Sequence, residues 1–338
     1  MHHNNYTIIR LILATLVVFG HFKVVPGLEL EATGIYGYAD FAVDAFFVVS
    51  GYLVYGSFAN SPEITTQKIG SFYIKRFFRI YPLYAAIILA QTIFMVWFFA
   101  DSVRFADVIK YLGSNLIFAN FISPDIGGVL SGLSNNAINP SLWTLKIEVM
   151  FYLAVPFLWW LINRYGFKAL LTIYILSTIF AMLSLHYGAE TLSKQFPGQL
   201  RLFVVGIAIY LYRDKFNMNF TMAFILAFMM FAICSFRSAL PLIPIYPLLV
   251  GTLVFICALR LPVMEPKYDI SYGVYLIHAP LIQAALLIGI YENNLVFLSL
   301  LLIAVFAAAF AAEKFIEIPM VRYGKKLSGI FSRKFARS

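Results

Sequence analysis

The stretch that decides the fold is residues 295–312, LVFLSLLLIAVFAAAFAA, which contains no charged residue and one polar residue, Ser299. An apolar helix of this length is long enough to cross the hydrocarbon core of a bilayer, which is about 30 Å thick. Apolar runs of similar length recur from one end of the sequence to the other. The first hypothesis is therefore a chain that crosses a membrane several times.

The overall composition excludes most other classes of protein. The 338 residues are 62% hydrophobic and 12% charged, with a mean hydropathy of +0.84. Soluble domains contain about 25% charged residues, so this is no soluble enzyme, and two cysteines are too few for a disulfide-rich secreted scaffold. The net charge of +9 does not indicate nucleic-acid binding, because the basic residues lie in short segments between the apolar runs.

Apolar length bounded by charged residues, Pro or Gly predicts ten transmembrane helices. They cover about residues 6–25, 41–58, 81–100, 141–163, 166–186, 196–213, 220–236, 241–259, 270–291 and 294–315. The first run carries Arg10 and lacks a small-residue cleavage site, so we interpret it as a retained helix and not as a signal peptide. We predict an all-α polytopic bundle, with a transmembrane domain over residues 1–320 and a basic cytoplasmic tail over residues 321–338.

The distribution of positive charge predicts the orientation of the chain. An even number of helices places both termini on one side of the membrane. Eighteen of the 25 Lys and Arg residues fall on the side of the termini in this topology. Basic residues are enriched in cytoplasmic segments, so we predict that both termini are cytoplasmic.

Two segments between the predicted helices differ in kind. Residues 101–140 lie outside in this topology, and they contain most of the run ISPDIGGVLSGLSNNAINPS, residues 122–141, which is rich in the Ser, Gly, Asn and Pro that favour turns. Residues 59–80 lie inside, where KIGSFYIKRFFRIYP, residues 68–82, mixes cations with aromatic residues. Composition favours an interfacial amphipathic helix that binds lipid headgroups, and the alternative is a binding site for a polyanionic ligand.

Ionisable residues at membrane depth mark candidate functional sites, because burying them in hydrocarbon costs free energy. Arg10 and His21 lie on one face of the first predicted helix, about 16 Å apart by helical rise. Asp44 and Glu148 enter the membrane from the outer side on the second and fourth predicted helices. His21, Asp44 and Glu148 are thus expected at a similar depth in the outer half of the membrane.

A histidine oriented by a carboxylate is a common general base, since the acid fixes the tautomer and stabilises the imidazolium. Each residue also has a structural alternative: His21 bonded to a carbonyl, Asp44 as a helix cap, and Glu148 paired with Lys146. Ser50 lies in no G-x-S-x-G motif, so a serine nucleophile is not indicated.

Six motifs in order resemble the acyltransferase-3 family of bacterial membrane O-acyltransferases. They are RLILATLVVFGH (residues 10–21), VDAFFVVSGYL (43–53), YIKRFFRIYPLY (73–84), SLWTLKIEVMFYL (141–153), SYGVYLIH (271–278) and IEIP (316–319). The resemblance spans nearly the whole chain. It implies a ten-helix enzyme of the bacterial inner membrane, in a standalone form, that transfers an acetyl group from acetyl-CoA to a hydroxyl of a cell-envelope carbohydrate or glycolipid.

The resemblance also implies residue roles. His21 is expected to act as general base, with Asp44 orienting it and Glu148 completing the catalytic set. Trp143, Ser50 and Tyr52 are expected to bind substrate, Ser50 and Tyr52 as candidate donors to the developing oxyanion. The residues expected to bind the donor are Arg10, Arg76, Arg79, Tyr275 and His278, and no metal is expected.

Another class of function stays open at this point. A secondary transporter of a glycan or an anionic metabolite could use His21, Asp44 and Glu148 as a proton relay. Transporters commonly contain related halves, and the two halves of this sequence place their charged residues differently. The enzyme is therefore the favoured hypothesis, and the sequence predicts no oligomeric state.

Overall fold

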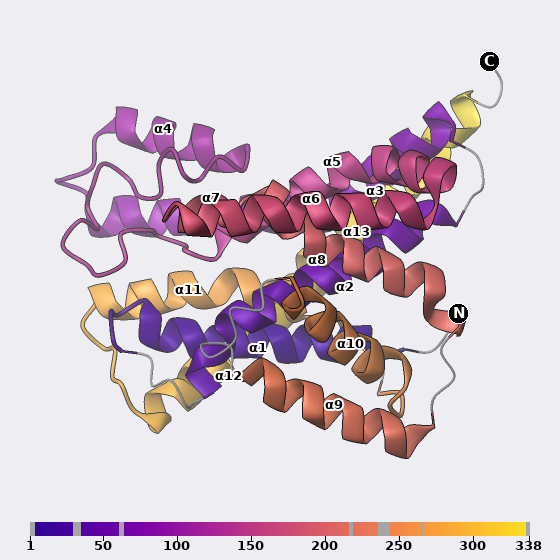
Figure 1. Cartoon of the computed structure of the whole chain (residues 1–338). Coiled ribbons are helices and arrows are strands. Elements are labelled where there is room, and N and C mark those ends of the chain that lie inside the picture. Colours follow the sequence, from indigo (N-terminus) through magenta and orange to yellow (C-terminus); the bar gives the residue numbers. More distant parts are fainter. Residues whose placement is uncertain are drawn as a thin grey trace. The chain divides into compact units, whose positions relative to one another are not determined.

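A computed structural model describes residues 4–29, 35–60, 64–215, 219–235, 244–264 and 266–335, and every regular element within them is helical (Figure 1). The helices in chain order are α1 (Tyr6–Val24), α2 (Ala39–Ala59), α3 (Thr66–Phe98), α4 (Phe105–Leu116), α5 (Leu142–Tyr165), α6 (Phe167–His186), α7 (Glu190–Ser193), α8 (Phe196–Tyr212), α9 (Phe220–Ser235), α10 (Tyr246–Leu259), α11 (Ser271–Leu287), α12 (Leu295–Ala312) and α13 (Ile318–Phe335).

Each of the ten predicted ranges overlaps one of these helices, which confirms the all-α prediction. Six segments are long and apolar enough to cross a membrane: Tyr6–Val24, Ile35–Ala59, Thr66–Phe98, Leu142–Tyr165, Phe167–His186 and Leu295–Arg333. The apolar helices α10 and α11 are shorter. The chain is a multi-pass membrane protein, and the number ten and the side of the termini stay predictions. Parts of two predicted helices and of the predicted tail lie outside the described residues, namely residues 236, 241–243 and 336–338.

The helices differ from the sequence prediction at two places. Helix α3 begins at Thr66 instead of near residue 81, and it continues past Pro82. Helix α4 lies inside the predicted outer loop, and it was missed because it is short and amphipathic, with only Tyr111, Ser114 and Asn115 buried. Helix α13 runs from Ile318 to Phe335, and the domain boundary at residue 320 stays a prediction.

The described chain divides into two compact units. The chain changes from one unit to the other within α1, α2, α3 and α5, and once more after residue 267. Unit 1 contains residues 1–13, 40–69 and 147–267. In it α6 and α10 pack against α8, and α9 packs against α10. Helices α2 and α8 meet at glycines, because a Cβ on Gly206 would lie 2.0 Å from the carbonyl oxygen of Val48. Small residues of this kind let membrane helices approach backbone to backbone.

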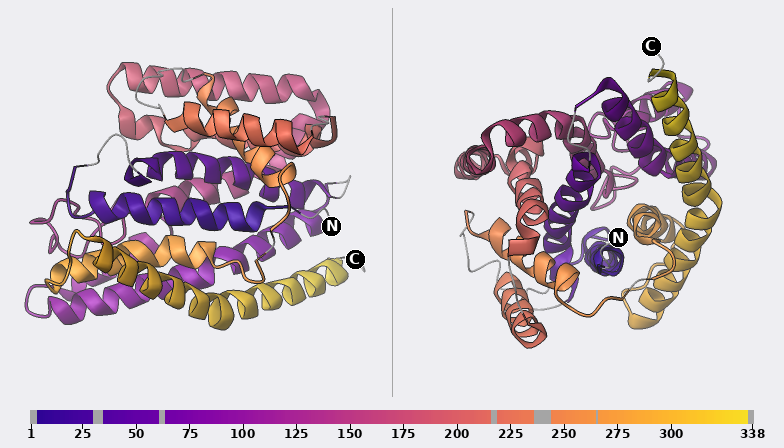
Figure 2. Two further views of the ribbon diagram at one scale, coloured as in Figure 1. Left: turned by 90° about the horizontal axis from the view of Figure 1, so that it is seen from below. Right: turned by 90° about the vertical axis from the view of Figure 1, so that its right-hand side faces the viewer.

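Unit 2 contains residues 14–39, 70–146 and 268–338. In it α11 packs against α12, and α12 continues through a π-helical turn, Glu313–Glu317, into α13 as one long bent helix (Figure 2). Helix α13 packs on α3 through small residues: a Cβ on Gly324 would lie 2.5 Å from Phe78, and the Ser71 and Ser332 hydroxyls are 2.7 Å apart.

Candidate active site

Two histidines from α1 and α11 meet in unit 2. His21 Nδ1 lies 2.8 Å from His278 Nε2, and the two rings stack with their centroids 5.0 Å apart. His278 is completely buried, and its Nδ1 lies 2.9 Å from the carbonyl oxygen of Val274 on the same helix. The sequence analysis placed His278 with the donor-binding residues, whereas the structure makes it a direct neighbour of the predicted general base.

A proline in α11 explains how the chain before α5 is held beside this pair. Pro280 has no N–H, so the carbonyl oxygen of Leu276, four residues earlier, has no helical donor. Asn139 Nδ2 donates to this carbonyl oxygen at 3.0 Å, and Asn139 Oδ1 accepts from the Ser141 N–H at 3.1 Å. The side chain of Asn139 therefore joins α11 to the chain that carries Ser141.

Ser141 brings a hydroxyl to the histidine pair. Its Oγ lies 3.4 Å from both His21 Nδ1 and His278 Nε2, and the residue is fully buried. The first turn of α5 is also bonded to α11, because the hydroxyls of Thr144 and Tyr275 are 2.7 Å apart and the Tyr275 hydroxyl donates to the Ser141 carbonyl oxygen at 3.3 Å. Tyr275 thus contributes to the scaffold around both histidines.

The end of α1 beyond His21 is anchored to the segment between α11 and α12. The Tyr291 hydroxyl donates to the carbonyl oxygen of Phe22 at 2.6 Å, and Lys23 Nζ donates to Asn293 Oδ1 at 2.7 Å. Burial raises the pKa of the Tyr291 hydroxyl to about 12, and electrostatic repulsion from Tyr36 adds a smaller effect in the same direction. The hydroxyl therefore stays protonated, and a hydrogen-bond donor, at physiological pH. These contacts hold the backbone next to His21.

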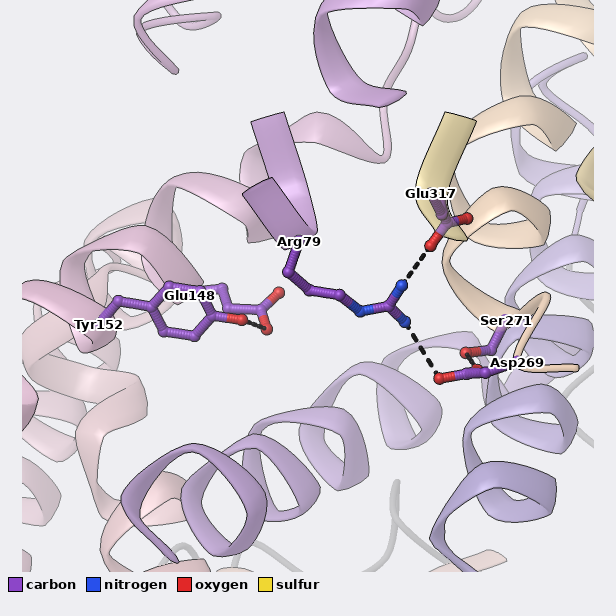
Figure 3. A network of polar contacts seen from close by, with 6 residues as sticks. All are labelled: Arg79, Glu148, Tyr152, Asp269, Ser271 and Glu317. Carbon is purple, nitrogen blue, oxygen red and sulfur yellow. Dashed lines mark hydrogen bonds and ion pairs between the residues drawn. The ribbon is translucent and has the colours of Figure 1, made fainter. Parts of the chain in front are cut away.

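Glu148 accepts two hydroxyl hydrogen bonds within unit 1. Ser50 Oγ donates to Glu148 Oε1 at 3.1 Å. The Tyr152 hydroxyl donates to the same oxygen at 2.7 Å, as Figure 3 shows. Asp44 is buried on α2, at 8% exposure, six residues before Ser50. Two predicted site residues, Ser50 and Glu148, are therefore in contact.

The other predicted residues of unit 1 have different surroundings. Tyr52 stacks on Tyr6 at a centroid distance of 4.5 Å and packs edge-on against Tyr210. Arg10 is half-buried on α1. The structure describes His21 in one unit and Asp44 and Glu148 in the other, so their predicted convergence stays a prediction.

Arg79 is bound by two carboxylates in unit 2. One guanidinium nitrogen donates to Glu317, and another donates to Asp269 Oδ2 at 3.0 Å (Figure 3). Glu317 is only 2% exposed and lies in the π-helical turn between α12 and α13. Ser271 Oγ donates to Asp269 Oδ1 at 2.6 Å. Three elements, α3, the π-helical turn and the chain before α11, are thus tied together through one arginine.

Arg76 and Trp143 are both partly exposed to solvent. Arg76 is half-buried, and its guanidinium lies 5.5 Å from the centre of the Phe72 ring. Trp143 is half-buried in the first turn of α5. Among the residues that the structure describes, no three His, Cys, Asp or Glu side chains are grouped to hold a metal ion.

Sequence reasoning missed Asn139, Ser141, Tyr152 and Asp269. Asn139 has a signal that points to its contact, because a proline inside an apolar helix predicts an unpaired carbonyl four residues earlier that a polar side chain must satisfy. Tyr152 also has one, since it follows Glu148 by four residues on one helix and such residues are neighbours on the helix surface. The contacts of Ser141 with His278 and of Asp269 with Arg79 join residues that are distant in sequence and carry no comparable pattern.

A family model described as an acyltransferase domain matches residues 3–314. The chain belongs to the acyltransferase-3 family. It is 25% identical over 312 residues to an O-acetyl transferase of Shigella phage Sf6, a match that covers 87% of this chain and 90% of that protein. It is 24% identical over 322 residues to nodulation protein 10 of Rhizobium leguminosarum bv. viciae, with 85% of both chains covered. No solved structure gives a significant match.

Membership in the acyltransferase-3 family confirms the resemblance seen in the six motifs. Together with the apolar helices, it makes this chain a membrane O-acyltransferase. Such an enzyme must deprotonate an acceptor hydroxyl and stabilise the charge that develops as the acyl group is transferred. The histidine pair supplies the kind of group that the first task needs.

Proposed function

We propose that this acyltransferase moves an acetyl group from acetyl-CoA to a hydroxyl of a cell-envelope carbohydrate or glycolipid in the bacterial inner membrane. The observation that carries the proposal is the buried contact between His21 and His278, which gives a family acyltransferase a positioned imidazole. The name of the phage relative, an O-acetyl transferase, supports acetyl as the transferred group.

In the proposed reaction, His21 accepts the proton of the acceptor hydroxyl while the hydroxyl oxygen bonds to the thioester carbonyl carbon. The carbon–sulfur bond then breaks, and the CoA thiolate leaves with the proton that His21 returns. The products are the acetyl ester and CoA thiol, so no further reactant is consumed. General-base catalysis of this kind typically contributes 10²–10⁴-fold to the rate.

The acceptor side of the proposal uses residues of α2 and α5. Glu148, held by Ser50 and Tyr152, is a fixed hydrogen-bond acceptor that suits a sugar hydroxyl. Trp143 offers an aromatic face for a sugar ring. Asp44 remains a proposed member of the catalytic set, and Tyr52 remains a proposed substrate contact.

The donor side uses the basic residues predicted to be cytoplasmic. Arg10, Arg76 and Arg79 are the proposed contacts for the CoA phosphates, because guanidinium groups bind phosphate oxygens through paired hydrogen bonds. Arg79 already neutralises part of the charge on Asp269 and Glu317, so a phosphate there competes with two carboxylates.

The test is acetyl transfer by the purified protein in lipid nanodiscs, supplied with acetyl-CoA labelled in the acetyl group and with isolated cell-envelope glycans. We expect label in an alkali-labile ester on the glycan. Mass spectrometry of envelope glycans from cells with and without the gene then identifies the acceptor, as a difference of one acetyl group. Absence of transfer from acetyl-CoA to every glycan fraction, by protein that still binds the glycan, would contradict the proposal.

A further inference from the structure

We propose that His278 is a positioning residue that holds His21 in the tautomer with a proton on Nδ1 and an unprotonated Nε2. This inference rests on the proposed function, because it explains how His21 becomes a base. The neutral imidazole of His278 then has the orienting role that the sequence predicts for the carboxylate of Asp44.

Hydrogen-bond accounting leads from the α11 backbone to His21. The carbonyl oxygen of Val274 can only accept a hydrogen bond, so His278 Nδ1, at 2.9 Å, carries a proton. In a neutral imidazole the other nitrogen is then an acceptor, which makes His278 Nε2 an acceptor. His21 Nδ1, at 2.8 Å, must therefore donate to it, and the lone pair of His21 is left on Nε2.

The opposite assignment requires a charged His278. If His278 Nε2 were the donor, both of its nitrogens would carry protons and the ring would be a cation. His278 is 0% exposed, and placing an isolated cation in such an environment has a large free-energy cost. The Ser141 hydroxyl, at 3.4 Å from both nitrogens, is too distant to replace the 2.8 Å contact as the main hydrogen bond.

The surroundings of His278 make it a rigid support. On α11 it comes within one turn after Tyr275, which is bonded to Thr144, and Leu276, whose carbonyl oxygen is bonded to Asn139. A catalytic group is effective when residues whose own positions are fixed hold it in place. His278 meets this condition through contacts made by its own helix.

The arrangement also matters during the reaction. When His21 Nε2 takes the proton of the acceptor hydroxyl, the His21 ring becomes a cation and its Nδ1–H becomes a stronger donor. The hydrogen bond to His278 Nε2 is then charge-assisted, and such bonds are about twice as strong as neutral ones. His278 thus stabilises the imidazolium without itself gaining or losing a proton, and the proton on Nε2 goes on to the leaving thiolate.

Three variants separate this role from donor binding and from simple packing. His278→Gln keeps an acceptor near the position of Nε2, whereas His278→Asn keeps a donor near Nδ1 but cannot reach His21. His278→Met fills the same space without either group. We expect His278→Gln to retain kcat within about tenfold, and the other two to lose about 100-fold in kcat with an unchanged KM for acetyl-CoA.

Equal activity in all three variants, or a loss confined to KM for acetyl-CoA, would overturn the proposal. Thermal unfolding of each variant accompanies the assay. If His278→Asn and His278→Met unfold during purification, the comparison of His278→Gln with wild type and the spectroscopic test below decide the matter.

The spectroscopic test does not depend on activity. The chain contains five histidines, and solid-state NMR of protein labelled with ¹⁵N-histidine distinguishes rings protonated on Nδ1 from rings protonated on Nε2. We expect Nδ1-protonated signals from both His21 and His278 at neutral pH, identified by their loss in His21→Ala and His278→Gln. A wild-type His21 protonated on Nε2 would refute the inference. If acetyl transfer fails but these tautomers are found, the proposed function is wrong and the geometry stands.

Discussion

His21 and His186 offer a direct comparison at the scale of single residues. His21 contacts a buried histidine on another helix, whereas His186 is exposed at the end of α6 and packs edge-on against its neighbour Tyr187. Both are histidines at the end of an apolar helix, so their sequence surroundings are alike. Their chemistry differs because of what the fold places beside them.

We expect His21→Ala to lower the rate of acetyl transfer by about 10²–10⁴-fold, the usual contribution of a general base, with little change in donor binding. The assay is label transfer at saturating acetyl-CoA, with binding of acetyl-CoA measured separately. His186→Ala is the matched control and should keep wild-type activity. Normal transfer by His21→Ala at matched protein concentration would remove His21 from the mechanism.

The two arginines of residues 76–79 should have separable roles. Loss of a hydrogen bond to a charged group costs about 1.5–3 kcal/mol, so we expect Arg76→Ala to raise the KM for acetyl-CoA roughly 10- to 100-fold. Arg79→Ala should instead lower the unfolding temperature, because it leaves the carboxylate of Glu317, which is 2% exposed, without its partner.

The double variant Arg79→Ala, Glu317→Gln tests this division. Removal of the buried carboxylate should recover part of the stability that Arg79→Ala loses, as measured by thermal unfolding in detergent. If Glu317→Gln gives no recovery and Arg79→Ala mainly raises the KM for acetyl-CoA, Arg79 acts as a phosphate contact.

At the scale of elements, the sequence predicts most helices because apolar length is a one-dimensional property. Helices α5, α6, α8 and α12 begin within one residue of their predicted starts. The start of α3 was missed because its first turns mix cations with apolar residues, and the helix nevertheless continues through them. Contacts such as that of Asn139 with Leu276 depend on which helices become neighbours, which apolar length does not reveal.

The break that Pro280 makes in the hydrogen bonding of α11 gives a prediction at this scale. Asn139→Ala leaves the Leu276 carbonyl oxygen without a donor, so we expect a loss of about 1–3 kcal/mol in stability. In a Pro280→Ala background the helix supplies its own N–H, and Asn139→Ala should cost less. The lost contact with the Ser141 N–H is common to both backgrounds and cancels in the cycle.

Stability is measured here by thermal or denaturant unfolding of the four proteins of this double-mutant cycle in the same detergent. A coupling free energy near zero would show that Asn139 does not substitute for the missing helical donor.

At the scale of the whole molecule, the predicted topology follows from charge and helix count. Gly166 and Gly188 lie in exposed turns at the two ends of α6, where an added Cβ would meet nothing within 4 Å. The topology places residue 166 in the cytoplasm and residue 188 outside. We expect an alkaline phosphatase fusion to be active at residue 188 and inactive at residue 166, and a fluorescent reporter at the C-terminus to fluoresce. The reverse pattern would invert the assignment of donor and acceptor sides.

The sequence indicates candidate site residues but not the contacts that they make. His21, Asp44 and Glu148 stand out in the sequence because ionisable residues are rare in apolar runs, and their roles stay predictions. The partner of His21, His278, is 257 residues away in the sequence. A contact of this kind is decided by how the helices pack, which the order of residues along each helix does not specify.

The π-helical turn at Glu313–Glu317 has a consequence for how the chain can vary in length. A π-turn holds one residue more than the same stretch of α-helix, and one residue corresponds to about 100° of helix rotation. Deleting a residue there would let the stretch become regular α-helix while α13 keeps its rotation, and with it the contacts of Gly324 and Ser332 with α3. A single-residue deletion within the regular part of α12 would instead turn α13 by about 100°, so we expect it to be tolerated less readily than a deletion in the π-turn.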